Sequence, residues 1–218
     1  MLKNFIATVS LLLICAAAAH SAEIHAVVKD HKGKVVADAV ILAVPVDPRN
    51  ALHARPPADA VDQVDKQFVP YVKPIFVGSR VRFPNSDNIR HQVYSFSPAK
   101  KFELPLYAGS GAQPIVFDKP GVVVLGCNIH DWMIGYVYVS ETPFFAKTGP
   151  AGTAVITDMP AGEYTVRLWH PSMDHAEETT NQHVTVTAEN AAVAEWQIGL
   201  KPNIRVPRVS GEASAAYP

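Results

Sequence analysis

The 218-residue chain has almost no cysteine, no surplus of positive charge and, beyond its N-terminus, no long hydrophobic run. Its two cysteines, Cys15 and Cys127, cannot build a disulfide framework. The 19 Lys and Arg against 20 Asp and Glu give a formal net charge of −1, which excludes the basic surface that nucleic-acid binding requires. Hydrophobic residues make up 48% of the chain, too many for a disordered protein and enough for one sizeable core or two small ones.

The N-terminal segment has the pattern of a secretion signal. Lys3 supplies a positive charge, and the apolar run at 5–19 is short for a membrane span and ends in small residues. We expect cleavage near Ala22, which makes residues 1–22 a signal peptide. The mature protein is then periplasmic or secreted, has no membrane span and has lost Cys15.

Cys127 is therefore the only cysteine of the predicted mature chain, and it enters an oxidising compartment without an intramolecular partner. Three interpretations are open at this point: an inert buried thiol, an intermolecular disulfide, or a thiolate held by a metal ion. The residues around Cys127 are needed to choose between them.

Short runs of β-branched and aromatic residues, separated by Gly, Pro, Asp and Asn, indicate an all-β fold. These runs are Ile24–Val28, Ala39–Val44, Ile75–Val77, Gln92–Phe96, Val122–Leu125, Tyr136–Val139, Tyr164–Leu168 and His183–Thr187. Helical character is limited to a turn or two at 174–180. The pattern favours β-sandwiches.

Changes in composition divide the mature chain into five segments. They are a strand pair at 23–46, a Pro- and Ala-rich linker at 47–61, a dense aromatic β region at 62–141, a further β region at 142–200 and a loose tail at 201–218. Turn-forming residues at 30–34 predict a hairpin-like pairing of the first two strands.

The chemistry of the chain is concentrated in the segment Cys127-Asn128-Ile129-His130-Asp131-Trp132-Met133. Apolar runs at 122–125 and 134–139 place this segment in the loop of a β-hairpin. A thiolate, an imidazole and a thioether on one tight loop can converge on a single ion. They are soft or borderline donors, which Ca²⁺ and Mg²⁺ do not select.

A second imidazole would complete a trigonal site of two His and one Cys with a weak axial Met, the ligand set of blue-copper electron-transfer centres. His91 is the candidate, because it follows an apolar strand and a polar loop. It lies 36 residues before Cys127, which leaves room for the intervening strands of a Greek-key sandwich. Zinc bound by the Cys and both His remains an alternative, as does a loop His91 without a metal role.

Residues 62–141 resemble the cupredoxins, the family of small type 1 copper proteins that includes plastocyanin and amicyanin. The resemblance rests on Gln67-Phe68-Val69-Pro70, Ile75–Phe83, Asn85–His91, Lys119-Pro120-Gly121 and the C-x2-H-x2-M loop, whose length is similar to that in amicyanin. It implies a Greek-key β-sandwich that binds one copper ion. The implied ligands are His91, Cys127, His130 and Met133.

Two positions depart from the family pattern. Many cupredoxins have Pro where this chain has Ile129, and they often have Asn where it has Gln92. Both positions lie beside ligands, so we expect them to change the surroundings of the site more than copper binding itself.

The whole chain also resembles secreted plastocyanin-like proteins that are often labelled methylamine-utilisation proteins. The segments Ile24–Val40 and Thr148–Val166 resemble a carboxypeptidase-regulatory-like domain, a small transthyretin-like β-sandwich. In that family Gly152 and Gly162 would serve tight turns and Tyr164 would pack inward. We therefore expect the two flanking β regions to form one sandwich, into which the copper domain is inserted.

A weaker cluster, His170, Met173 and His175, places two imidazoles and a thioether within six residues. It is a candidate second metal site. The alternative is a strand end that turns at Pro171, with the three side chains placed by packing.

The sequence thus predicts a blue copper protein that carries single electrons and is not an enzyme, because four protein donors leave no open metal position for a substrate. We expect a redox protein partner such as a c-type cytochrome or a dehydrogenase. His130 is the expected exposed edge for electron passage, and the candidates for an apolar docking rim are Ile129, Trp132, Ile134, Phe144 and Phe145. Two alternatives are a copper-trafficking protein without a redox role and a ligand-binding or structural β module.

Overall fold

The computed structural model describes residues 22–51, 56–110 and 113–202. The predicted signal peptide up to residue 21, with Cys15, and most of the predicted tail lie outside this range. The fold class is all-β, as the sequence predicts; the helices of the described residues are two short 3₁₀ helices, η1 (Pro48–Asn50) and η2 (Glu177–Thr180). None of them has the length and apolar character needed to cross a membrane.

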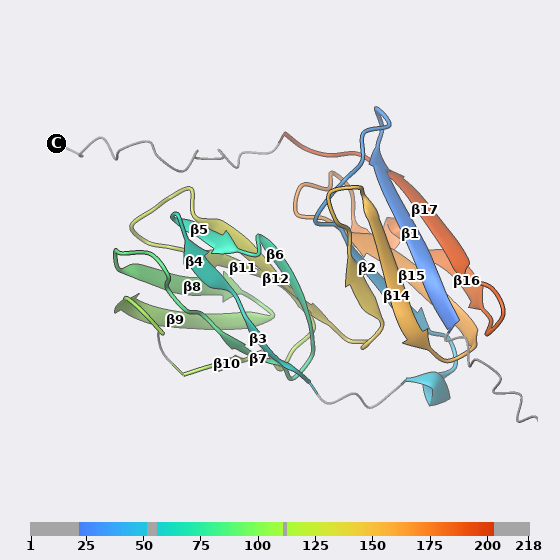
Figure 1. Cartoon of the computed structure of the whole chain (residues 1–218), viewed down its shortest axis with the longest axis horizontal. Coiled ribbons are helices and arrows are strands. Elements are labelled where there is room, and N and C mark those ends of the chain that lie inside the picture. The colour runs from blue at the N-terminus through green and yellow to red at the C-terminus, as the bar shows by residue number, and fades with distance from the viewer. Residues whose placement is uncertain (1–21, 52–55, 111–112, 203–218) are drawn as a thin grey trace, which may run out of the picture.

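The strands between residues 58 and 140 form a central group, drawn from teal to yellow in Figure 1. They are β3 (Ala58–Ala60), β4 (Asp62–Val64), β5 (Gln67–Val69), β6 (Val72–Phe76), β7 (Arg80–Arg82), β8 (His91–Ser97), β9 (Lys100–Tyr107), β10 (Ile115–Val116), β11 (Gly121–Gly126) and β12 (Ile134–Ser140). A five-stranded sheet has the order β6-β12-β11-β8-β9, and a three-stranded sheet has the order β10-β7-β3. Alternate residues of both sheets bury one apolar core, in which Val81 and Phe117 meet Val93 and Val123.

The remaining strands form a flanking group, drawn in blue and in yellow to red in Figure 1. They are β1 (Ala22–Asp30), β2 (Val40–Pro45), β13 (Phe145–Lys147), β14 (Thr153–Met159), β15 (Gly162–Trp169), β16 (Gln182–Val186) and β17 (Ala192–Ile198). Their two sheets have the orders β14-β1-β17 and β13-β2-β15-β16. Strands that precede the central group in the sequence therefore pair with strands that follow it.

The expected hairpin of the first two strands is wrong. The turn itself forms, since the N–H of Gly33 donates to the carbonyl of Asp30 at 2.9 Å, but β1 and β2 lie in different sheets. Asp38, with φ of 62°, redirects the chain between them. The hydroxyl of Thr148 then accepts from the N–H of Ala39 at 2.9 Å and holds the start of β2 in the second sheet.

The predicted linker is shorter than 47–61. Its last part, β3, pairs in parallel with β7 and belongs to a sheet of the central group. Val61 directly after it is 1% exposed. The pairing depends on backbone hydrogen bonds with a distant strand, which the Pro- and Ala-rich composition does not indicate.

The flanking group confirms the inward position expected of Tyr164, which is fully buried while its hydroxyl donates to the carbonyl of Pro160 at 2.8 Å. Gly152 has φ of 71°, and a Cβ there would lie 2.7 Å from the carbonyl oxygen of Val28. Both the conformation and the close approach require glycine at this turn.

The two groups pack against each other through a shared apolar cluster. Val40 and Leu42 of β2 meet Val72 and Tyr138 of the central group, while the other face of β2 enters the core of the flanking group. This explains the uninterrupted apolar run of β2, because a strand buried on both faces has no polar alternation.

Polar side chains close the edge of this contact. The hydroxyl of Tyr138 donates to Glu177 at 2.6 Å, and Arg167 donates to both Glu177 and Glu141 at 2.6 Å. Arg167 and Glu177 belong to the flanking group, whereas Tyr138 lies on β12, the strand that begins directly after the candidate metal-binding loop.

Candidate metal centre

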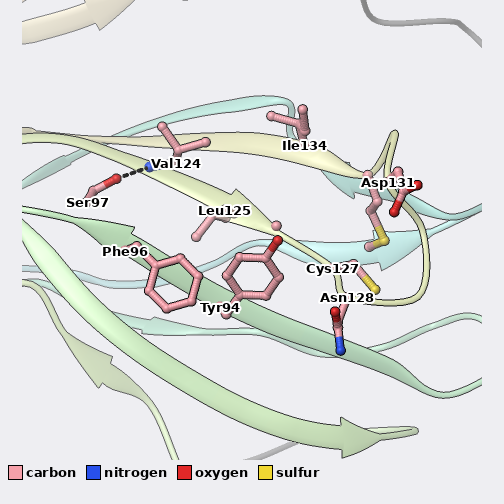
Figure 2. A pocket seen from close by; sticks show the side chains of 11 residues that line it. Tyr94, Phe96, Ser97, Val124, Leu125, Cys127, Asn128, Asp131 and Ile134 are labelled. Carbon is pink, nitrogen blue, oxygen red and sulfur yellow. Dashed lines mark hydrogen bonds between the residues drawn. The ribbon is translucent and has the colours of Figure 1, made fainter.

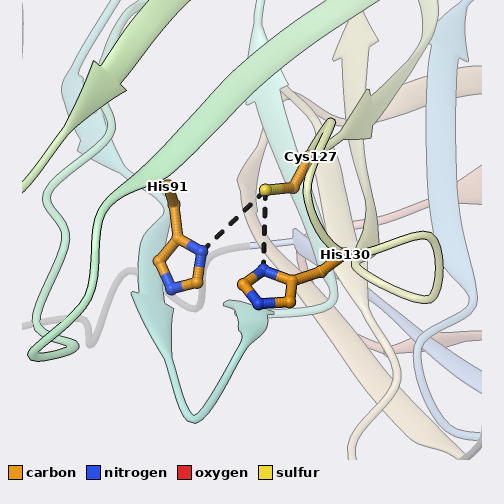
Figure 3. A group of neighbouring side chains, drawn as sticks. All are labelled: His91, Cys127 and His130. Atoms are coloured by element: carbon orange, nitrogen blue, oxygen red, sulfur yellow. Dashed lines mark hydrogen bonds between the residues drawn. The ribbon is translucent and has the colours of Figure 1, made fainter. Parts of the chain in front are cut away.

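Three potential metal ligands converge on one point of the central group. His91 is the first residue of β8, Cys127 directly follows β11, and His130 lies in the loop before β12. Their ligand atoms lie within 4.8 Å of one another, and no other group of three or more His, Cys, Asp or Glu side chains meets that condition in the described part of the chain. Figure 3 shows the two imidazoles directed at the sulfur; their Nδ1 atoms lie 3.9 Å (His91) and 3.8 Å (His130) from Sγ.

Local backbone contacts fold the loop tightly enough to bring its donors together. The N–H of Met133 donates to the carbonyl of His130 at 2.9 Å, and the N–H of Ile134 donates to that of Trp132 at 3.0 Å. Cys127 is 4% exposed and Met133 is 1% exposed, and both belong to the central apolar core. Both side chains are therefore buried in that core.

His91 is fixed by a residue that the sequence analysis missed. Nε2 of this buried histidine lies 2.7 Å from a carboxylate oxygen of Asp87. The same carboxylate accepts from the N–H of Asp65 at 2.6 Å and from that of Lys66 at 2.9 Å. The position of an acidic residue four residues before a candidate ligand is the one sequence feature that indicates this contact, and it is a weak one.

The carboxylate of Asp87 favours a proton on Nε2 of His91. Burial acts to raise the pKa of Asp87, but the N–H of Lys66, the His91 ring and the N–H of Asp65 outweigh it and hold the pKa below its usual value. Because an ionised carboxylate only accepts, Nε2 of His91 donates to it. The lone pair of Nδ1 then faces the sulfur of Cys127, as a metal ligand requires.

The donor spacing fits a single metal ion bound by the two imidazoles and the thiolate. Metal bonds of about 2.0–2.1 Å to imidazole and about 2.3 Å to thiolate separate N and S by about 3.8 Å at 120° and by about 3.6 Å at the tetrahedral angle. The observed 3.9 and 3.8 Å are close to both values, so one ion can be bound by all three side chains. Two imidazoles and a thiolate with a neighbouring thioether also have the chemical character that copper prefers.

In the structure, each of the three side chains of the weaker cluster makes a contact of its own. Met173 is buried in the core of the flanking group. Nδ1 of His170 accepts from the N–H of Ser172 at 3.1 Å, and burial lowers the pKa of this ring. Nδ1 of His175 lies 2.7 Å from the carboxylate of Asp174. Packing and local hydrogen bonds are thus sufficient to explain their positions, and the second metal site stays a prediction.

Part of the expected docking rim is also corrected. Phe144 is 4% exposed in the core of the flanking group, and Phe145 packs in the cluster shared by the two groups, so neither belongs to a rim around the metal centre. Ile129 is 50% exposed beside His130. Only 9% of the surface of His130 is exposed to solvent, so the exposed edge expected for electron passage is small. The Trp132 ring packs beside it, with the ring centroids 5.2 Å apart.

Gln92, one of the two departures from the family pattern, forms a contact of its own. Its side-chain amide donates to Glu103 on the neighbouring strand β9 at 2.6 Å. It therefore strengthens the strand that carries His91 through a pair in the sheet.

No family model matches the sequence. No curated protein matches it either. Among solved structures, the chain is similar to a copper-containing nitrite reductase from Thermus scotoductus, with 29% identity, 45% of this chain and 25% of that chain covered and a TM-score of 0.37. It is similar to a purple cupredoxin from Nitrosopumilus maritimus, with 26% identity, 38% and 100% covered and a TM-score of 0.33. A reduced amicyanin variant shows 21% identity, 47% and 99% covered and a TM-score of 0.35. The first similarity thus spans a quarter of the nitrite reductase chain.

Proposed function

We propose that this protein is a type 1 copper protein that carries single electrons between redox partners. The observation that carries the proposal is the convergence of the Nδ1 atoms of His91 and His130 on Cys127 Sγ, at 3.9 and 3.8 Å, in a buried site. Met133, six residues after Cys127 and buried in the same core, is the proposed axial ligand. Copper bound there would supply a one-electron couple.

The protein holds the proposed metal ligands in fixed positions and away from water. Cys127 and Met133 lie at the two ends of a loop closed by β11 and β12, which pair in register from Gly121 to Gly126. Asp87 holds the ring of His91. Ligands that cannot move or take up water change little when an electron arrives, and small rearrangement favours fast electron transfer.

We propose that the protein is not itself an enzyme, because two imidazoles, a thiolate and a thioether leave no metal position for a substrate. A zinc site would use the Cys and the two His but gains little from the thioether. We favour electron transfer over copper trafficking because His170, Met173 and His175, which a trafficking protein could use, already have packing or hydrogen-bond partners.

The remaining expectations form part of the proposal. Residues 62–141 are a copper domain inserted into a carboxypeptidase-regulatory-like sandwich, which the pairing of β1 with β14 and β17 supports. The protein acts in the periplasm or outside the cell after removal of residues 1–22. Its partner is a redox protein such as a c-type cytochrome or a dehydrogenase, docked near Ile129, Trp132 and Ile134.

The test is addition of Cu(II) to the purified mature protein, followed by visible spectroscopy and voltammetry. We expect an intense thiolate-to-copper charge-transfer band that bleaches on reduction and a reversible one-electron wave. Cys127→Ser should abolish the band. A colourless product, or a colour that survives Cys127→Ser, would refute the proposal; colour without a reversible wave would favour a trafficking protein.

A further inference from the structure

A cavity of about 510 Å³ opens beside the metal centre. Cys127 and Met133 line it, together with Asn128 and Asp131 of the same loop, while His91 and His130 do not. Figure 2 shows the sulfur of Cys127 and the side chain of Asn128 at one end of this cavity, with aromatic side chains along it. The cavity thus reaches the centre from the side of its sulfur atoms.

We propose that this cavity is the route by which copper enters the apoprotein, and that Asp131 attracts the ion to it. The inference rests on the proposed copper-binding function and adds the path and order of binding. Because Asp131 and Asn128 are exposed whereas Cys127 and Met133 are buried, an ion that enters the cavity meets the first two residues before the last two. The imidazoles are reached last.

Neither imidazole lines the cavity, so an ion inside it does not meet a histidine first. His91 is fully buried, and its Nε2 is held by Asp87. His130 packs against Trp132, and although its 9% exposure exceeds the 4% of Cys127, it does not line the cavity. The Nδ1 atoms of both rings face Cys127 Sγ, so an ion reaches them by passing the sulfur.

Among the described residues that line the cavity, Asp131 is the only charged one. It is exposed, and its carboxylate forms no ion pair within the described residues. By contrast, Asp118 on the same strand group is paired with Lys100 at 2.9 Å. An exposed, unpaired carboxylate in the wall of a cavity raises the local concentration of cations.

The rest of the wall directs the ion inward because it offers few donors. Tyr94 and Phe96 form an aromatic pair with ring centroids 5.2 Å apart, and Phe96 is 74% exposed. The Tyr94 ring lies over Gly126, where a Cβ would approach its Cζ to 2.7 Å. Ser97 Oγ already accepts from the N–H of Val124 at 2.9 Å. Soft Cu(I) in particular has thiolate and thioether as its best ligands in this cavity.

The electrostatic arm of the test measures loading of the apoprotein by stopped-flow absorbance after mixing with Cu(II) at low ionic strength. Asp131→Asn should load about three- to ten-fold more slowly, with an effect that shrinks as salt is added and an unchanged final spectrum. Asp118→Asn, which removes a carboxylate outside the cavity, should load as wild type does. Equal rates for Asp131→Asn and wild type would overturn the role of Asp131.

The steric arm compares two exposed valines changed to tryptophan. Val124 lines the cavity and is 41% exposed, whereas Val193 lies on β17 of the flanking group and is 61% exposed. Val124→Trp should slow both copper loading and alkylation of the apoprotein thiol by iodoacetamide several-fold; Val193→Trp should slow neither. Alkylation that is unaffected by Val124→Trp would overturn the route, provided that circular dichroism shows a folded variant. If this variant does not fold, equal copper-loading rates for Asp131→Asn and wild type would overturn the proposal instead. A wild-type protein that never becomes coloured would instead refute the proposed function.

Discussion

Asp87 and His91 are joined by a 2.7 Å contact between a carboxylate oxygen and Nε2, and this contact connects the metal centre to the turn between β4 and β5. Asp65 and Lys66 of that turn have φ of 51° and 58°, and this conformation directs both of their N–H groups at the carboxylate. The orientation of one proposed ligand is therefore set by backbone that lies more than 20 residues away in the sequence.

Asp87→Asn should weaken Cu(II) binding and raise the reduction potential. Asparagine keeps an acceptor for Nε2 of His91 but lacks the negative charge of Asp87. That charge stabilises Cu(II) more than Cu(I). Loss of such an outer contact typically costs about 10- to 100-fold in metal affinity. Competition titrations and voltammetry measure both effects, with Asp118→Asn as the control. An unchanged affinity together with an unchanged potential would show that the contact does not influence the metal.

Substitution of Met133 should change the potential in opposite directions according to the replacement. Met133→Leu removes the weak axial donor and should raise the potential while the visible band remains. Met133→Gln supplies a harder oxygen donor, which favours Cu(II), and should lower it. Voltammetry of the two variants decides; equal potentials in both variants and in wild type would mean that Met133 is not a ligand.

The polar contact between the two strand groups should contribute to the stability of the whole chain. Arg167→Met leaves the carboxylates of Glu177 and Glu141 without their guanidinium donor at a partly buried position, and we expect a loss of about 1–3 kcal/mol in the free energy of unfolding. Arg49→Met removes an exposed pair with Asp47 and should cost less than about 1 kcal/mol. Urea unfolding of both variants provides the comparison, and equal losses would count against a structural role for Arg167.

Stability should decline in alkaline solution because buried tyrosines resist ionisation. Burial raises the pKa of Tyr107 to about 12, and burial together with Glu177 raises the pKa of Tyr138. Unfolded tyrosines lose their protons near pH 10, so the stabilisation is complete below about pH 10 and is lost as the pH rises toward 12. Urea midpoints across this interval should fall steeply in wild type and less steeply in Tyr107→Phe. Parallel curves would exclude Tyr107 as a source of the decline.

The metal-binding loop could be predicted from sequence because its chemistry is local. Cys127, His130 and Met133 lie within seven residues between two apolar strands, and the hairpin brings them together. His91 was predicted from its place after an apolar strand and from the family resemblance, and the structure puts its ring beside Cys127.

Features that depend on distant backbone could not be predicted in this way. The role of Asp87 depends on contact between the turn at residues 65–66 and the loop at residue 87. The periodicity of side chains along the sequence does not predict that contact. The first two strands suggested a hairpin because the turn between them is real, although burial of β2 on both faces places it in the other sheet. Conversely, the spacing of His170, Met173 and His175 suggested a cluster, but packing buries Met173 in a core.

The central claim is that a single ion is bound by one thiolate and two imidazoles. X-ray absorption spectroscopy of the protein loaded with one equivalent of Cu(II) tests it most directly. We predict one short copper–sulfur distance and two imidazole nitrogens for wild type, with the sulfur contribution absent in Cys127→Ser and unchanged in a His170→Ala/His175→Ala variant. A first shell of nitrogen and oxygen without sulfur in the wild-type protein would contradict the account.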